Sequence, residues 1–212
     1  MREPASKLQS FIWAVVLLNL AFVAVLYLRS TREAAGPVRE LPVIAAVGEF
    51  TLTNQLGRTI SRADLLGNVW VADIIFTRCP GPCPKMTGQM AQLQTGLAAD
   101  LPVKFVTLTA DPAFDTVAVL KQYGETHRAD PARWLFLTGD KRGVYGLAMS
   151  GLKLGVEERT SEQPLPLEDQ FVHTTVFMLV DKQGRLRGSF ESAEPEFQKQ
   201  ILLAVKQLLR EK

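Results

Sequence analysis

About a third of the way along the chain, residues 69–76 (VWVADIIF) form a run that is apolar apart from one aspartate. Such a run is typical of a strand that is buried on both faces of a sheet, which happens where helices cover both faces. From about residue 43 to residue 212, segments with strand and helix patterns alternate around this run. Their order predicts an α/β sandwich with a mixed central sheet.

The other elements of this domain are predicted from local patterns of apolar and turn residues. Gly57 separates two short strands that form an N-terminal β-hairpin. Asp115 is expected at the start of a helix, because acidic groups suit a helix N-terminus. The predicted strands cover residues 50–53, 59–61, 103–109, 134–137, 176–180 and 185–190, and the predicted helices cover residues 83–98, 115–126, 140–149 and 194–209.

The composition excludes several classes of protein. An apolar content of 47% is too high for a disordered chain. A net charge of +2, from 24 basic and 22 acidic residues, offers no basic face, so we expect no nucleic-acid partner. With only two cysteines, the chain is neither a disulfide-rich scaffold nor a Cys-rich zinc protein.

Residues 11–28 (FIWAVVLLNLAFVAVLYL) carry no charge and include a single amide, Asn19. At about 1.5 Å per residue, a helix of this length just spans a hydrocarbon core of about 30 Å. Trp13 and Tyr27 lie near its ends, as in an interfacial aromatic belt, and polar rather than small residues follow it. These features favour one uncleaved transmembrane helix over a cleaved signal peptide, with the lipid bilayer as a partner through residues 11–28.

This anchor divides the chain into four predicted parts. Residues 1–10 form an N-terminal tail, 11–28 the transmembrane anchor, 29–42 a polar linker and 43–212 the globular domain. Basic residues flank the anchor on both sides, so the charges alone do not decide its orientation.

Cys79 and Cys83 lie between the buried strand and the following helix, in the sequence CPGPCP. The second cysteine therefore falls at or near a helix N-terminus, where unpaired N–H groups and the helix dipole favour a thiolate. Two convergent thiolates are soft ligands suited to Cu(I), and they can also form a redox dithiol that exchanges disulfides. A structural disulfide or a pair of inert thiols is the third alternative, and a disulfide that closes so short a loop adds little stability.

Three segments carry motifs that occur together in one known family. Residues 77–84 (TRCPGPCP) are similar to T-x-C-P-x-x-C-P, residues 109–116 (TADPAFDT) to D-P-x-x-D-T, and residues 172–181 (VHTTVFMLVD) to a strand that begins D-H-[ST]. Together they resemble the Sco/SenC family of copper chaperones, in order, from about residue 43 to residue 210. The resemblance implies a thioredoxin-like fold in which the histidine just before the predicted strand 176–180 faces the cysteine pair.

The resemblance also implies a site and a function. Copper would be held by Cys79, Cys83 and His173, as Cu(I) by two sulfurs and one nitrogen or as Cu(II) with an added ligand. The protein would be a metallochaperone that assembles the copper centre of cytochrome c oxidase, with the oxidase copper-site subunit or another copper chaperone as partner. Copper would pass to the partner's thiolates by ligand exchange, and oxidation to a Cys79–Cys83 disulfide would abolish the site. The domain would face the periplasm from the bacterial inner membrane.

The chain departs from the family pattern at two positions. Val172 replaces the usual Asp before His173, and Val117 replaces the Pro that often follows the D-T pair. Neither change removes a ligand, but the first changes what orients the imidazole.

Asp73 interrupts the buried strand upstream of Cys79, and a buried carboxylate is costly unless it is paired or protonated. Thioredoxins carry an aspartate at a similar offset, where it assists proton transfer. An alternative function is therefore a membrane-anchored thiol–disulfide reductase, with Cys79 or Cys83 as nucleophile and Asp73 as proton relay. Enzymatic activity thus stays open, and a copper or redox sensor that signals by protein contact is a third alternative.

The other candidate residues have simpler interpretations. His127 is expected at a solvated helix end, and Met86 and Met90 are expected in the core rather than as copper ligands. Residues 157–170 form a polar, acidic loop before the histidine strand. We expect this loop to be mobile and to become ordered when metal or a partner binds.

Overall fold

The computed structural model describes residues 5–33, 41–161, 163 and 165–211. The chain divides into two compact units, Met1–Glu40 and Leu41–Lys212. Residues 1–4 of the predicted tail and 34–40 of the predicted linker lie outside the described residues.

The first unit is described as one helix, α1 (Ala5–Glu33), which extends beyond the predicted residues 11–28 at both ends. The apolar side chains described in it, between residues 11 and 25, are exposed, with Trp13 at 61% and Leu18 at 74%, since the described part of this unit offers them nothing to pack against. Within the described part of the chain, no helix combines the length and the apolar character needed to cross a membrane, so the transmembrane prediction is not confirmed.

In the described part of the second unit, eight strands form one mixed sheet in the order β1-β10-β9-β4-β5-β6-β2-β3. β4, β5 and β6 pair in parallel, and the other neighbours are antiparallel. A separate two-stranded sheet joins β7 to β8. The bounds are β1 (Ala45–Ala46), β2 (Thr51–Asn54), β3 (Thr59–Ser61), β4 (Val69–Ile75), β5 (Val103–Thr109), β6 (Trp134–Thr138), β7 (Val156–Glu158), β8 (Phe171–His173), β9 (Val176–Val180) and β10 (Arg185–Glu191).

The predicted mixed sheet and N-terminal β-hairpin are confirmed. Every residue of β4 is buried, as the apolar run indicated. Strands β2 and β3 form the hairpin, and Gly57 in its turn has a φ of 74°, a left-handed conformation that glycine adopts without a side-chain clash. β1, β7 and β8 were not predicted, because strands this short leave too few residues to show an alternating pattern.

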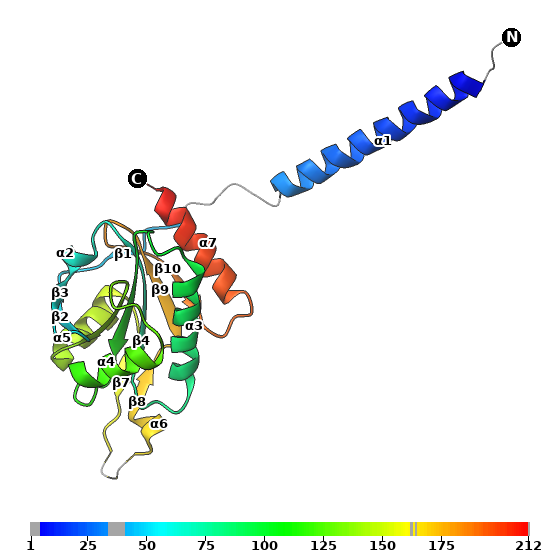
Figure 1. The fold of residues 1–212 in the computed structure, drawn as a ribbon. Coiled ribbons are helices and arrows are strands. Elements are labelled where there is room, and N and C mark those ends of the chain that lie inside the picture. Colours follow the sequence, from blue (N-terminus) through cyan, green and yellow to red (C-terminus); the bar gives the residue numbers. More distant parts are fainter. Residues whose placement is uncertain (1–4, 34–40, 162, 164, 212) are drawn as a thin grey trace. The chain divides into compact units, whose positions relative to one another are not determined.

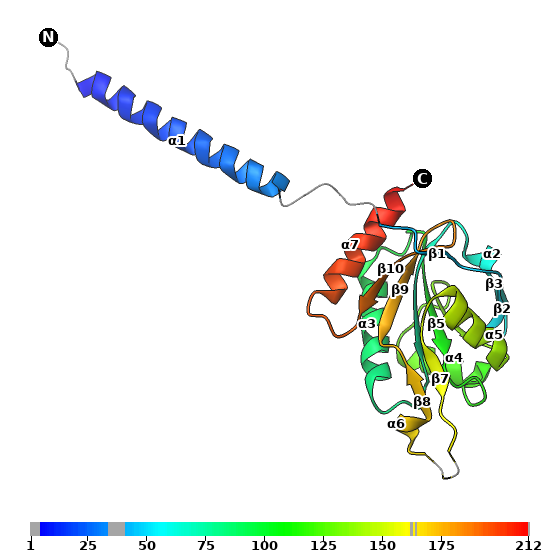
Figure 2. The same cartoon turned by 180° about the vertical axis from the view of Figure 1, so that it is seen from behind.

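Helices cover both faces of the sheet (Figures 1 and 2). Two of them, α3 and α7, lie on one side, and α5 lies on the other. The helices of this unit are α2 (Arg62–Leu65), α3 (Pro82–Gly96), α4 (Val117–Thr126), α5 (Lys141–Tyr145), the π-helix η1 (Gly146–Gly151), α6 (Leu167–Gln170) and α7 (Phe197–Arg210). The predicted helix 140–149 is therefore two elements, α5 and η1, which sequence periodicity does not separate.

The sheet topology brings three distant segments to one edge. β4 and β5 are parallel, so the loops that follow them leave the sheet side by side. β9 is antiparallel to β4, with Ala72 opposite Met178, so the residues just before β9 lie at the edge where β4 ends. The cysteine loop, the connection after β5 and the strand β8 therefore meet there.

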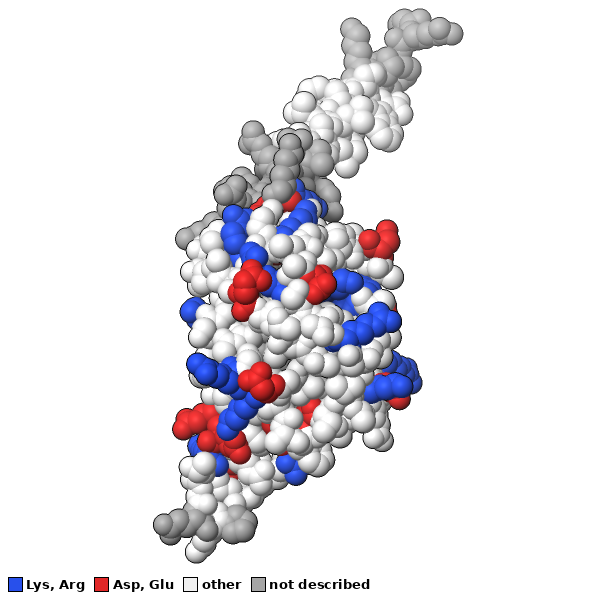
Figure 3. All heavy atoms as spheres, turned by 90° about the vertical axis from the view of Figure 1, so that its left-hand side faces the viewer, with Lys and Arg blue, Asp and Glu red and all other residues white. Residues whose placement is uncertain are grey.

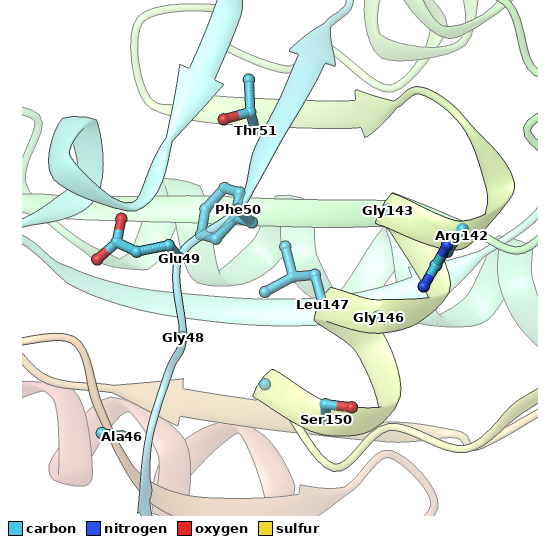
Figure 4. Close-up of a pocket in the computed structure, with 11 residues that line it drawn as sticks. Ala46, Gly48, Glu49, Phe50, Thr51, Arg142, Gly143, Gly146, Leu147 and Ser150 are labelled. Atoms are coloured by element: carbon cyan, nitrogen blue, oxygen red, sulfur yellow. The ribbon is translucent and has the colours of Figure 1, made fainter.

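One face of the molecule carries a mixture of charges. Figure 3 shows basic and acidic side chains interspersed among uncharged residues on that face, without a continuous area of one sign. A groove of about 410 Å³ lies between residues 46–51 and the α5–η1 segment (Figure 4). Glu49 points away from that helical segment in Figure 4.

Candidate metal centre

Cys79, Cys83 and His173 come together at this edge of the sheet. Cys79 lies in the loop after β4, Cys83 in the first turn of α3, and His173 at the end of β8. One ligand atom from each residue lies within 4.8 Å of the other two, and the Cys83 Sγ to His173 Nε2 distance is 3.2 Å. Both cysteines are free thiols and both are buried.

The His173 ring is oriented by the backbone carbonyl of Thr174 and by an aromatic neighbour. Nδ1 lies 3.2 Å from the carbonyl oxygen of Thr174. A carbonyl oxygen can only accept, so this contact assigns the proton to Nδ1 and leaves the lone pair of Nε2 facing Cys83. The edge-on contact with Phe76, at 5.9 Å between ring centroids, supports the same orientation. Burial lowers the pKa of His173, so the ring is neutral and able to bind a metal near pH 7.

The departure at position 172 leaves this arrangement intact. The side chain of Val172 is 43% exposed, and it alternates with His173 along β8, so it points to the opposite face of the strand. A side chain at position 172 is therefore not what orients the imidazole here. The carbonyl of Thr174 orients the ring instead.

Burial decides the electrostatics of Cys83. The sequence predicted a thiol favoured as thiolate by the helix N-terminus. Instead the pKa of Cys83 is raised, first by burial and then by its interaction with the Cys79 thiol. That part of the prediction is wrong, because loss of hydration in a site with no exposed surface at Cys83 outweighs the partial charge of the helix end. A bound cation would supply the missing compensation for a buried thiolate.

The loop that carries Cys79 is held by the connection between β5 and α4. Asp115 accepts hydrogen bonds from the backbone N–H of Thr77 at 3.1 Å, from the hydroxyl of Thr77, and from the hydroxyl of Thr109 at 2.5 Å. Burial raises the pKa of Asp115, and these hydrogen bonds partly oppose the increase. The sequence prediction for Asp115 is therefore wrong in detail, since the N-cap of α4 is Thr116 and the Asp115 side chain turns toward the cysteine loop.

Asp73 is fully buried next to the site. Neither of its carboxylate oxygens has a hydrogen-bond donor in good geometry among the described residues. Thr107 lies beside it in register on β5, but burial dominates and raises the pKa of Asp73 to about 7. The group is therefore protonated in mildly acidic solution and can exchange a proton near neutrality.

The remaining candidates do not join the cluster. Met86 and Met90 are fully buried in the core, as expected. His127 ends α4 and packs on Tyr123, with ring centroids 4.5 Å apart. The predicted loop 157–170 begins instead within β7, which pairs with β8, and it ends with the short helix α6, so it is shorter than expected. Its predicted mobility stays a prediction.

The donor set fits a soft metal ion. Two sulfurs and one neutral imidazole nitrogen are the ligands that Cu(I) prefers, and three such donors give trigonal coordination. Zn²⁺ in structural sites usually takes four ligands, and the described residues offer three in this group. The site lies at the sheet edge and not in the groove of Figure 4, whose lining includes none of these ligands.

Fold and site together define an α/β protein of the thioredoxin-like class that carries a Cys–Cys–His cluster suited to copper. The family described as SCO1/SenC matches residues 40–210, and the chain belongs to that family, as the sequence motifs predicted.

Similar proteins have names that concern copper and cytochrome c oxidase. The "SCO1 protein homolog" of Bacillus subtilis is 32% identical over 155 residues, which are 72% of this chain and 77% of that protein. A structure of BsSco, described as a member of the Sco family of cytochrome c oxidase assembly proteins with a disulfide switch, has a TM-score of 0.68 at 30% identity and covers 82% of this chain and 98% of its own. Bradyrhizobium japonicum ScoI with copper bound shares the fold, with a TM-score of 0.64 at 22% identity over 77% of this chain and 99% of its own.

Proposed function

We propose that this chain is a copper-binding metallochaperone for assembly of the copper centre of cytochrome c oxidase. The observation that supports it most directly is the convergence of Cys79, Cys83 and His173, whose ligand atoms lie within 4.8 Å of one another. The description of BsSco as a member of a family of cytochrome c oxidase assembly proteins supports the choice of target. The oxidase subunit that carries the copper site, or another copper chaperone, is the proposed partner.

The proposed mechanism is ligand exchange. Each thiol that binds copper gives up a proton, so loading releases protons to solvent. His173 needs no such step, because its Nε2 already presents a lone pair. Thiolates of the partner then displace the three ligands one at a time. Oxidation of the two thiols to a disulfide gives up two electrons and two protons to an oxidant and removes two of the three ligands.

Titration with Cu(I) tests this function. The reduced full-length chain should bind one equivalent in competition with a Cu(I) chelator, and the His173→Ala variant should bind at least about tenfold more weakly while keeping its two titratable thiols. The chain contains only two histidines, so His127→Ala is the matched control and should bind like the wild type. Equal affinity in the wild type and both variants would contradict the assignment of His173 as a ligand.

We also propose that residues 11–28 anchor the chain in the bacterial inner membrane with the domain in the periplasm. Its support is the uncharged sequence and the exposed apolar side chains of α1, which need a nonpolar environment. Alkaline carbonate extraction of membranes should leave the full chain in the pellet and release a chain that begins at residue 41. Release of both would contradict the anchor.

Asp73 favours one alternative function, a thiol–disulfide reductase. A carboxyl group with a pKa raised to about 7 beside a buried thiol can accept its proton as the thiolate forms. The reaction would transfer two electrons from Cys79 and Cys83 to a partner disulfide, leaving a disulfide in this chain. Under this function Asp73→Asn should slow reduction of a model disulfide at least tenfold without changing Cu(I) affinity, and an unchanged rate would exclude the relay.

A further inference from the structure

We propose that Asp115 is a positioning residue of the metal site, which sets the place of the Cys79 sulfur through Thr77 without contacting any ligand. The inference rests on the proposed copper-binding function and adds to it a carboxylate that belongs to neither the ligand set nor its immediate neighbours. It concerns the connection between β5 and α4, residues 110–116, which follows the strand next to the cysteine strand.

Both carboxylate oxygens of Asp115 accept hydrogen bonds from residues just before the cysteines or beside them on β5. Oδ2 accepts from the Thr77 N–H at 3.1 Å and from the Thr109 hydroxyl at 2.5 Å, and Oδ1 accepts from the Thr77 hydroxyl. The Asp115 residue has no exposed surface. Hydrogen bonds to a buried carboxylate are among the stronger ones in proteins, so Thr77 is fixed in both its backbone and its side chain.

The next residue of the loop is held by the same connection. Arg78 donates to Asp111 at 2.7 Å, and its guanidinium lies 3.8 Å from the centroid of the Phe114 ring. The connection is itself closed by the hydrogen bond from the Asp115 N–H to the Asp111 carbonyl at 2.8 Å. The two residues directly before Cys79 are therefore attached to one rigid turn.

The helix that follows this turn, α4, contributes to the support of Cys83. The Thr87 hydroxyl donates to the Cys83 carbonyl at 2.9 Å, and the Tyr123 hydroxyl lies 2.8 Å from the Thr87 hydroxyl. Tyr123 belongs to α4, which begins just after Asp115. One continuous stretch of chain thus contacts the supports of both cysteines.

The two sulfurs therefore differ in what restrains their positions. Cys83 lies in a helix, whose own hydrogen bonds restrain it. Cys79 lies in a loop and has one backbone hydrogen bond, from its N–H to the Phe76 carbonyl at 3.1 Å. The position of Cys79 therefore depends strongly on Asp115, whereas the position of Cys83 depends mainly on α3. Loss of Asp115 should change the distance between the two sulfurs.

The test compares Asp115→Ala with Asp181→Ala in the full-length chain. Asp181 is a matched control, because it is also buried, also accepts several hydrogen bonds, among them one from Arg187 at 2.8 Å, and lies at the opposite end of β4. Three quantities are measured for each variant: the Cu(I) dissociation constant, the equilibrium constant between the dithiol and the disulfide in a glutathione buffer without copper, and the thermal midpoint of unfolding.

We expect Asp115→Ala to weaken Cu(I) binding about 10- to 100-fold and to shift the dithiol–disulfide equilibrium. Asp181→Ala should lower the unfolding midpoint and change neither of the other two quantities. Asp115→Asn should restore most of the affinity, because the Thr77 hydroxyl can rotate to accept from the new amide. Should Asp115→Ala fail to fold, Thr77→Val, which keeps the shape and removes one donor, should show the same loss in weaker form.

Wild-type Cu(I) affinity in Asp115→Ala, or an equal loss in Asp181→Ala, would overturn the proposal. If the wild-type chain itself binds no Cu(I), the proposed function fails. In that case the dithiol–disulfide equilibrium constant, measured without copper, tests the role of Asp115 by itself. A shift confined to the Asp115 variants supports the positioning role, and an unchanged constant refutes it.

Discussion

Replacing Asp73 by Asn should make the stability of the domain less dependent on pH. Asp73 is fully buried, and burial raises its pKa from 3.8 to about 7. The folded chain therefore holds this proton to a higher pH than the unfolded chain does. The stabilisation is fully present below about pH 4 and is lost as the pH rises through about 7, after which an ionised carboxylate must be kept in the core.

The size of the effect follows from the pKa difference. One unit corresponds to about 1.4 kcal/mol, so the full loss is about 4 kcal/mol, of which about 2.5 kcal/mol falls between pH 5 and pH 8. The Asp73→Asn variant lacks the titration and has nearly the same shape. Its free energy of unfolding, relative to that of the wild type, should therefore increase by about 2.5 kcal/mol over that range.

Urea unfolding followed by tryptophan fluorescence measures this difference, because Trp70 and Trp134 are buried and report on loss of the core. The reduced, metal-free domain beginning at residue 41 is unfolded at several pH values from 5 to 8. Asp140→Asn, at the N-cap of α5, is the control for replacing a carboxylate elsewhere. Parallel pH profiles for the wild type and Asp73→Asn would refute the buried, proton-holding state of Asp73.

Three further predictions concern metal binding and packing. The apparent Cu(I) affinity should rise with pH between 6 and 8, by up to about tenfold per unit for each thiol proton released, because burial raises the pKa of Cys83; a chelator competition series would show a flat profile if the thiol were already ionised. Arg187→Ala should lower the free energy of unfolding by about 3 kcal/mol, since it leaves the buried Asp181 short of a partner, and urea midpoints measure the loss. Gly124→Ala should destabilise the fold, because the added carbon lies 3.2 Å from the Phe136 ring of β6. Gly88→Ala, which faces open space, should stabilise the fold by about 0.5–1 kcal/mol. Thermal midpoints that shift in the same direction for both variants would contradict the packing argument.

The central strand and the placement of the cysteines were predictable from composition and local pattern. An apolar run such as β4 is best buried on both faces, and Cys83, the second cysteine of CPGPCP, falls in the first turn of α3 as predicted. The approach of His173 was predicted by resemblance. The structure shows its physical cause, which is the antiparallel pairing of β9 with β4.

Other features of the site depend on contacts between distant segments and were missed. Asp115 looked like a helix-initiating acid, since nothing local indicates that Thr77 donates to it across the sheet edge. The raised pKa of Cys83 depends on how much of the thiol the folded chain covers, which spacing alone does not reveal. Among the described residues the strands β7 and β8 form a two-stranded sheet of their own, so no wider sheet imposes a recognisable pattern on their sequences.

The buried guanidinium of Arg187 helps to define where the Cys–Cys–His cluster lies relative to the point at which the chain enters the domain. It donates to the Leu41 carbonyl at 2.6 Å and to the Glu211 carboxylate at 2.7 Å, and thereby joins the first and last described residues of the domain beside the beginning of β4. The cysteines and the histidine lie at the other pole of that strand, roughly 20 Å away for a strand of this length. Under the proposed function, a recipient protein would therefore reach the Cys–Cys–His cluster from the pole of the domain opposite to the one where the chain enters it.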